Sequence, residues 1–268
     1  MTKRLFLYIL LVGLTVPLFS SQNEKLIFGK KYLKNSIPKF HPASEYFSKQ
    51  YENYRADKSS PNFNKLLIIR VEFQEDNDTN TTGNGKFITE IDPNYGPSID
   101  SPPHNKIYYE TQMEALKYYY RAVSYENYQL QFDVFPKEIQ AYTLPHPMSY
   151  YNPGPSSSLF ISRIEEYFHD IFTIADQDTS IVFGNYGHYM VIHAGSDWQH
   201  DTKGDTPNDI PSFFIRVGTG KEVTVDDGAT TISHACNVPE TITQDINEKE
   251  ENGNTFVYGY GAVNAVYA

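Results

Sequence analysis

Cysteine and tryptophan are almost absent from this chain of 268 residues, which has one of each. With Cys236 as the only thiol, an intrachain disulfide is excluded, and the fold has to be held by its hydrophobic core or by bound metal ions. Hydrophobic residues nevertheless make up 40% of the chain and aromatic residues 15%. This composition is sufficient for a packed core and excludes wholesale disorder.

Basic residues are also scarce, because 22 Lys and Arg are set against 33 Asp and Glu, for a net charge of −11. The positive charge is concentrated near the N-terminus, so the remainder of the chain is more acidic still. Such a chain repels nucleic acid, which we exclude as a partner. An acidic body suits an extracellular protein with Ca²⁺-binding loops, although solubility alone also explains it.

The only long hydrophobic run lies at residues 5–19, after a basic pair and before two serines. It is shorter than the roughly 18–20 residues that cross a bilayer. The pattern predicts that residues 1–20 are a signal peptide and that the protein is secreted, without a permanent membrane span. An uncleaved anchor is the alternative. Residues 21–61, rich in Lys, Tyr, Ser and Asn, are interpreted as an N-terminal arm or prosegment, or as a linker.

The standard catalytic patterns are missing. No Gly-x-Ser-x-Gly elbow places a nucleophilic serine, and residues 83–86 lack the spacing of a phosphate-binding loop. Glu165 and Glu166 are adjacent on a predicted helix, so they cannot flank one substrate bond and are interpreted as a solvated face. None of the eight histidines belongs to a His-Glu-x-x-His sequence, the spacing that puts two zinc ligands on one helix face.

Hydrophobic periodicity predicts strands alternating with two amphipathic helices, which indicates an α/β or α+β layer fold. The strands are expected at residues 66–74, 128–134, 138–144, 189–192, 212–217 and 222–225. The helices are expected at residues 107–124 and 160–175. The first helix is expected to face the core with an aromatic stripe of Tyr109, Met113, Leu116, Tyr120 and Val123.

Three finer expectations follow from the same patterns. The first strand begins as a continuous apolar run, so it is expected to be central and covered on both faces. Residues 138–144 are expected to form a hairpin with the strand before them. The serines at 156–158 are expected to cap the second helix.

A loop after the strand at 189–192 carries four aspartates at intervals of four residues: Asp197, Asp201, Asp205 and Asp209. Carboxylates on a loop at a strand end can bind Ca²⁺, although the EF-hand arrangement is absent. Two interpretations stay open, a Ca²⁺ site and a solvated acidic loop. His193, at the end of the strand, is expected to be a hydrogen-bonded structural histidine.

Residues 261–268 have small apolar residues at helical spacing after Gly259 and Gly261. No capping glycine, basic turn or polar tail follows them. Because half an apolar helix would leave its partners uncovered, these residues are expected to begin a buried helix of a longer protein.

Several short motifs follow one another in a recognisable order: Val71-Glu72-Phe73, Tyr118-Tyr119-Tyr120, Val123-Ser124-Tyr125, Leu130, Tyr150-Tyr151, His193-Ala194-Gly195 and the sequence of residues 258–268. Together with the export signal, this series resembles the N-terminal half of the immune-inhibitor-A-like family of secreted zinc metallopeptidases, over roughly residues 62–268. The resemblance implies a zincin-like catalytic domain. Residues 62–268 would form its upper lobe, a mixed sheet with two helices that is incomplete at its C-terminal end.

In that family the second helix carries the zinc-binding His-Glu-x-x-His, and residues 261–268 resemble its lead-in. The resemblance implies that the full-length parent is a zinc-dependent endopeptidase acting on protein or peptide substrates. A zinc-bound water would attack the peptide carbonyl with Glu as base, and an edge strand would align the substrate. No catalytic or zinc residue can be carried over to residues 1–268. This chain by itself is therefore expected to be inactive and to bind no stoichiometric zinc.

A second hypothesis keeps the secreted location and discards the catalysis. The chain would then be a non-catalytic module, related to a degenerate peptidase, that binds protein or glycan through its 22 tyrosines. The coding sequence just beyond Ala268 discriminates between the two hypotheses.

Overall fold

The computed structural model describes residues 62–90, 101–154, 156–201 and 203–242, and the backbone of residues 246–251 and 254–260. The chain divides into two units, Met1–Tyr54 and Arg55–Ala268, and the described residues belong to the second. The predicted signal peptide, the N-terminal arm and the terminal helix lie outside the described residues.

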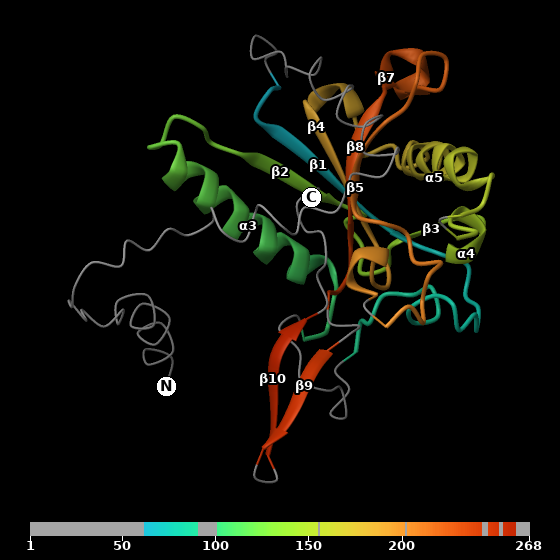
Figure 1. Ribbon diagram of the computed structural model, residues 1–268. Helices are drawn as coiled ribbons and strands as arrows, with labels where there is room; N and C mark the ends of the chain where they lie inside the picture. The colour runs from blue at the N-terminus through green and yellow to red at the C-terminus, as the bar shows by residue number, and fades with distance from the viewer. Residues whose placement is uncertain are drawn as a thin grey trace, which may run out of the picture. The chain divides into compact units, whose positions relative to one another are not determined.

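A mixed six-stranded β-sheet organises the described residues (Figure 1). Its strands are β1 (Lys65–Glu72), β2 (Gln131–Phe135), β3 (Tyr142–Thr143), β4 (His188–His193), β5 (Phe213–Arg216) and β8 (His234–Pro239). The order is β2-β1-β4-β8-β5, and the short β3 also pairs with β1. All pairs are parallel except β5 with β8, so β5 is an antiparallel edge strand. The predicted class, helices with a mixed sheet, is confirmed.

Two long helices and a short one accompany the sheet: α3 (Lys106–Val123), α5 (Phe160–Ala175) and α4 (Met148–Tyr151). α3 contacts β2 and α4 contacts α5, while α3 and α5 lie on opposite sides of the sheet (Figure 1). Asn105 caps α3, because its side chain accepts the N–H groups of Ile107 and Tyr108 at 3.0 and 3.2 Å. α5 starts differently from the prediction. Its N-cap residue is Leu159, whose own N–H is accepted by Ser157 Oγ at 3.2 Å.

Smaller elements complete the described fold. They are the 3₁₀ turns η1 (Phe183–Asn185), η2 (Trp198–His200) and η3 (Asp226–Gly228), the hairpin of β6 (Val223–Val225) with β7 (Thr230–Ile232), and the hairpin of β9 (Ile246–Glu251) with β10 (Asn254–Tyr260). Among the helices described, none has the length and apolar character needed to cross a membrane.

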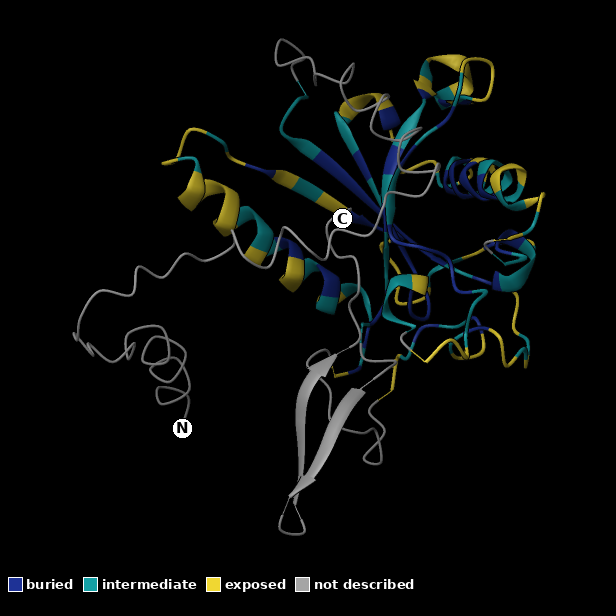
Figure 2. Ribbon diagram, viewed as in Figure 1, coloured by how far each residue is buried: buried dark blue, intermediate teal, exposed yellow. Residues whose placement is uncertain are grey.

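The hydrophobic core is built around β1, whose residues from Leu66 to Val71 are all buried (Figure 2). The continuous apolar run is therefore a central strand with both faces covered, as predicted. The predicted stripe on α3 is correct only in its first half. Tyr109 and Met113 are buried, whereas Tyr120 and Val123 are 42% and 53% exposed.

One charged side chain of β1, Arg70, is completely buried. Its guanidinium donates to carbonyl oxygens of the loop that follows β2, those of Ile139, Pro136, Glu138 and Gln140, at 2.9, 3.0, 2.6 and 3.3 Å. These bonds hold the loop beside β1. The chain then continues along β1 in the same direction as β2, and β3 pairs in parallel with the end of β1. The predicted hairpin between residues 128–134 and 138–144 is wrong for this reason.

Candidate functional site

The carboxyl ends of the parallel strands β1, β4 and β8 meet at one edge of the sheet. Ligands of open α/β sheets bind at such an edge. Here the chain packs closely. Gly195, two residues after β4, has a φ of +82°, and a Cβ at this position would lie 2.9 Å from the carbonyl oxygen of Thr82. Only glycine accommodates both the conformation and the contact.

A buried carboxylate, Glu240, joins three segments at this edge. Its Oε1 accepts the N–H of Ile88 at 2.6 Å and lies 2.8 Å from His104 Nδ1. Its Oε2 accepts the N–H of Gly195 at 2.9 Å. Because both oxygens are engaged and both His104 and Glu240 side chains are inaccessible to solvent, we assign Glu240 a structural role.

His193, the last residue of β4, is completely buried. Its Nδ1 lies 3.0 Å from the carbonyl oxygen of Ala194, so Nδ1 carries the proton and donates. Burial lowers the pKa of His193 to about 4, so the ring is neutral at pH 7. The expectation of a hydrogen-bonded histidine is confirmed for Nδ1, whereas Nε2 has no hydrogen-bond partner among the described residues.

The first two aspartates of the acidic loop, Asp197 and Asp201, accept hydrogen bonds from different groups. Asp197 is buried, accepts the N–H of His200 at 3.0 Å, and also contacts the His200 ring and the Ser212 hydroxyl. Ser212 donates to the aspartate and not to the histidine, so the three residues do not form a nucleophilic triad. Asp201 shapes the loop, because it accepts the N–H groups of Gly204 at 2.7 Å and Asp205 at 3.0 Å.

The other two aspartates differ in burial. Asp205 is exposed, whereas Asp209 is completely buried. Asp209 accepts the N–H of Thr82 at 2.7 Å and the Thr82 hydroxyl at 2.6 Å. Burial raises the pKa of Asp209 to about 7, although these hydrogen bonds oppose the rise.

The four predicted Ca²⁺ ligands do not assemble as a group in the described part of the chain. In that part of the chain, a different set of three residues brings its ligand atoms within 4.8 Å of one another. The calcium site at Asp197, Asp201, Asp205 and Asp209 therefore stays a prediction. The structure adds that three of these carboxylates already have protein hydrogen-bond donors.

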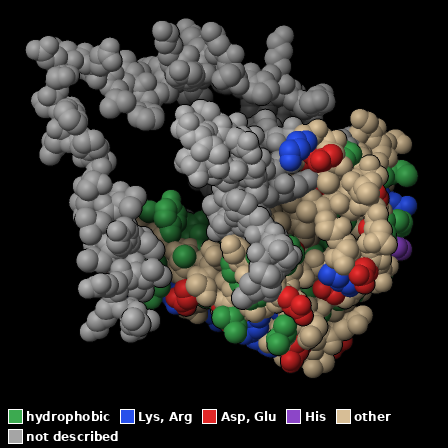
Figure 3. Space-filling view, turned by 90° about the horizontal axis from the view of Figure 1, so that it is seen from below, with side chains coloured by type: hydrophobic (Ala, Val, Ile, Leu, Met, Phe, Trp, Pro, Cys, Tyr) green, Lys and Arg blue, Asp and Glu red, His purple; other side chains and the backbone are tan. Residues whose placement is uncertain are grey.

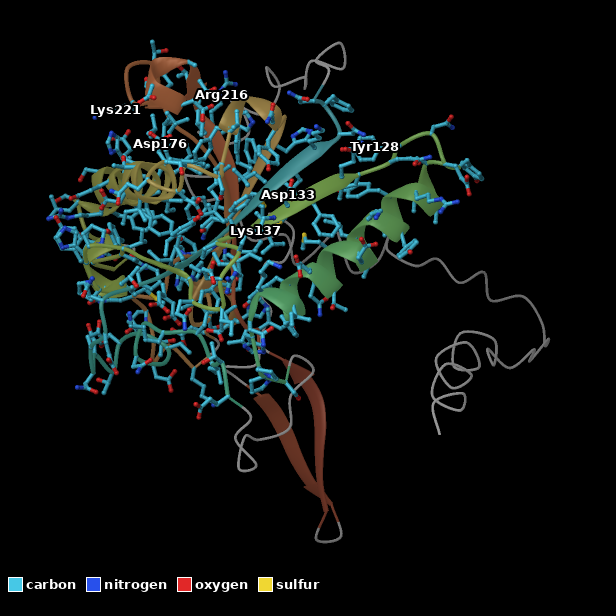
Figure 4. The ribbon with its side chains drawn as sticks, turned by 180° about the vertical axis from the view of Figure 1, so that it is seen from behind. Tyr128, Asp133, Lys137, Asp176, Arg216 and Lys221 are labelled. Carbon is cyan, nitrogen blue, oxygen red and sulfur yellow. The ribbon has the colours of Figure 1, made fainter. Side chains whose placement is uncertain are left out.

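The edge of β5 that faces away from β8 is a second candidate site. β5 pairs with β8 on one side, from Phe213 opposite Asn237 to Arg216 opposite His234. No other strand of the described chain pairs with its second side. Arg216, at the end of this strand, is labelled in Figure 4. Unpaired N–H and C=O groups on an edge strand accept an extended peptide by β-addition.

The set of clustered ligand atoms lies on α5 and the loop before α4: His146, Glu166 and Asp170. Sequence reasoning missed it, because the histidine is distant in sequence and Glu166 was interpreted as part of a solvated face. Glu166 is instead only partly exposed and contacts Arg163 and Tyr150. The spacing of Glu166 and Asp170, one helical turn apart, was the available signal.

The single thiol of the chain, Cys236, lies on β8 and is half-buried. Burial raises the pKa of its thiol, which disfavours the reactive thiolate.

Comparisons of this chain with protein families, with curated proteins and with solved structures found no match.

Proposed function

We propose that residues 62–268 form the upper lobe of the catalytic domain of a secreted zinc endopeptidase, the function that the family resemblance implies. The observation that carries the proposal is the antiparallel edge strand β5 on an otherwise parallel sheet with two long helices. The mixed sheet and its edge strand agree with the sheet and the substrate-aligning edge expected of that lobe. The motif order and the export signal support it independently.

In this proposal β5 binds the substrate and does not cut it. An extended peptide would align along β5 on the side away from β8 and pair through its main chain. Main-chain pairing fixes the direction and the register of the substrate and leaves side-chain preference to neighbouring pockets. Phe213 and Phe214 are half-buried beside this edge, so apolar substrate side chains are favoured there.

The zinc of this family does not fit the residues of this chain. The sequence contains no His-Glu-x-x-His, and the described cluster of ligand atoms includes one histidine only. We therefore place the family's zinc ligands outside residues 1–268 and derive no catalytic step from the residues present.

The coding sequence beyond the codon for Ala268 tests the proposal. The reading frame is expected to continue directly into His-Glu-x-x-His, with a third zinc ligand further along. A stop codon at this point, or a continuation without paired histidines, would contradict the peptidase assignment.

One observation favours the alternative of a non-catalytic binding module. Tyr118, Tyr119 and Tyr125, on and just after α3, are 60%, 60% and 88% exposed. Exposed aromatic rings are favourable contacts for protein or glycan partners. On the face shown in Figure 3, hydrophobic side chains, a class that includes tyrosine, are exposed between charged ones. If the reading frame lacks paired histidines, this tyrosine surface becomes the first candidate, and Tyr118→Ser with Tyr119→Ser should abolish partner binding.

A further inference from the structure

We propose that His146, Glu166 and Asp170 form a binding site for a divalent transition-metal ion of the zinc class. One ligand atom from each residue lies within 4.8 Å of the others. A zinc ion sits about 2.0–2.2 Å from nitrogen and carboxylate ligands, so the three atoms have to approach slightly further. Rotation of partly exposed side chains supplies this movement.

The scaffold holds the three ligands on one side of α5. Glu166 and Asp170 are four residues apart on the helix, so their carboxylates lie on the same face. The helix is fixed to the sheet by Tyr167, which is buried and donates its hydroxyl hydrogen to Asn237 Oδ1 of β8 at 2.9 Å. The carboxylates therefore belong to a rigid element, as a metal site requires.

His146 is held in position by its backbone and its ring. Its carbonyl oxygen accepts the N–H of Gln74 at 3.2 Å, just beyond β1. Its ring stacks on Tyr150, with centroids 3.8 Å apart and an angle of 24° between the planes. Neither ring nitrogen has a hydrogen-bond partner in the described part of the chain, so one imidazole nitrogen is available to an ion.

Two tyrosines support the carboxylates from behind. Tyr150 donates to Glu166 Oε1 at 3.0 Å, and Tyr151 donates to Asp170 Oδ2 at 2.7 Å. A tyrosine hydroxyl is protonated at neutral pH, so both groups can donate to the carboxylates. Hydrogen bonds to the carboxylate ligands are the usual outer shell of a metal site, because they fix the orientation of the coordinating oxygens.

The ligand set favours a transition metal over Ca²⁺. Ca²⁺ takes six to eight oxygen ligands, whereas this cluster offers two carboxylates and one imidazole. Imidazole nitrogen is a preferred ligand of Zn²⁺ and its neighbours in the first transition row. Three protein ligands leave a fourth position for water or an external ligand. The sequence analysis expected no stoichiometric zinc because the chain lacks paired histidines. The proposed site differs, because it combines one histidine with two carboxylates.

Arg163 competes with the ion. Its guanidinium donates to Glu166 Oε2 at 2.6 Å and lies over the ring of Tyr150, 3.8 Å from the centroid. This cation neutralises part of the acidic charge and repels a second cation. Replacing Arg163 by Met keeps an apolar chain over the ring and removes the charge, so it should strengthen metal binding.

Titration of the full metal-free chain with Zn²⁺ tests the proposal, with calorimetry as the readout. One equivalent is expected to bind to the wild type. His146→Phe, which keeps a ring against Tyr150, and the near-isosteric Glu166→Gln and Asp170→Asn should each weaken binding more than tenfold. His169→Ala is the matched control, because His169 lies on the same helix but is exposed and outside the cluster, and it should bind Zn²⁺ like the wild type.

Arg163→Met separates metal binding from folding, because a gain of affinity cannot arise from a folding defect. We expect roughly fivefold tighter binding from the loss of one nearby positive charge. No binding by the wild type, equal binding by His146→Phe, or unchanged affinity in Arg163→Met would overturn the site. The titration uses a chain without His-Glu-x-x-His, so its outcome is independent of the proposed peptidase function.

Discussion

Arg70 has an unusual environment for a charged side chain. It is buried in the central strand, and the described chain gives its guanidinium backbone carbonyl oxygens in place of a carboxylate. Burial lowers the pKa of Arg70, yet a guanidinium stays charged in proteins. The carbonyl dipoles of the loop therefore stabilise a buried cation, and the cation in turn shapes the loop between β2 and β3.

We expect Arg70→Met to destabilise the protein by about 3 kcal/mol or more, because it leaves carbonyl oxygens of a partly buried loop without donors. Urea unfolding, with the midpoint and slope compared between the proteins, is the measurement. Arg121→Met is the control. Arg121 is about half exposed and paired with Glu126, so its loss should change stability by no more than about 0.5 kcal/mol. Equal effects of the two substitutions would show that the loop does not depend on Arg70.

At the scale of elements, sequence periodicity predicted the features that depend on local pattern. The apolar run of β1, the stripe of α5 and the short run of β4 lie within a few residues of their predicted positions. β8 was missed, because its sequence, His234–Pro239, contains His, Cys, Asn and Pro and has no apolar alternation. Its place in the sheet is decided by β4 and β5 on either side, which no local pattern reports.

The candidate sites were less predictable than the strands for a related reason. The acidic loop was visible in the sequence, but the burial of Asp209 depends on Thr82, which lies in a different loop. The cluster on α5 also needs His146, which precedes the helix by many residues. The carbonyl oxygen of His146 accepts the N–H of Gln74, and this bond helps to hold His146 near α5. Such contacts depend on the tertiary fold, so the spacing of residues along the sequence does not predict them.

Asp209, in the acidic loop, accepts two hydrogen bonds from Thr82 in the loop after β1. Because the pKa of Asp209 is raised, the stability of the protein is expected to depend on pH. The folded protein holds the proton more tightly than the unfolded chain, where the pKa is about 3.8. The stability contributed by this proton is therefore complete at acid pH and is lost as the pH rises from about 4 to about 7. With about 1.4 kcal/mol for each pKa unit, the loss is at most about 4.5 kcal/mol.

Asp209→Asn should remove this loss, because the amide stays neutral and can keep both contacts with Thr82. Relative to the wild type, the variant is expected to gain stability steadily between pH 4 and pH 7 and no further above it, as measured by urea unfolding. His193, whose pKa is lowered to about 4, has the opposite pH dependence but is common to both proteins. Asp205→Asn, at an exposed position, should follow the wild type. A parallel pH profile for Asp209→Asn and the wild type would contradict the raised pKa.

At the scale of the whole molecule, the described residues supply a mixed sheet with an antiparallel edge strand and a cluster of three potential metal ligands, and no assembled catalytic group is found among them. In the proposed function β5 offers main-chain groups to an extended peptide. Near the carboxyl ends of the strands, Glu240 accepts backbone N–H groups and Asp197 accepts the Ser212 hydroxyl. Binding a peptide in one orientation lowers KM without accelerating the chemical step. The proposed lobe therefore depends on residues outside this chain for catalysis.

The whole chain is accordingly expected to cleave no protein substrate, with or without added Zn²⁺. A fluorescent casein assay on the zinc-loaded chain, on the chelated chain and on the full-length parent measures this. The parent should show cleavage that a chelator abolishes, whereas the chain alone should match buffer in both states. Zinc bound at the α5 cluster does not change this expectation. The Glu166 and Asp170 carboxylates would coordinate the ion and already accept hydrogen bonds from Tyr150, Tyr151 and Arg163. The described residues therefore offer no separate general base beside the ion. Chelator-sensitive cleavage by the chain that disappears in His146→Phe would instead place the chemistry at this cluster and refute the peptidase-lobe interpretation.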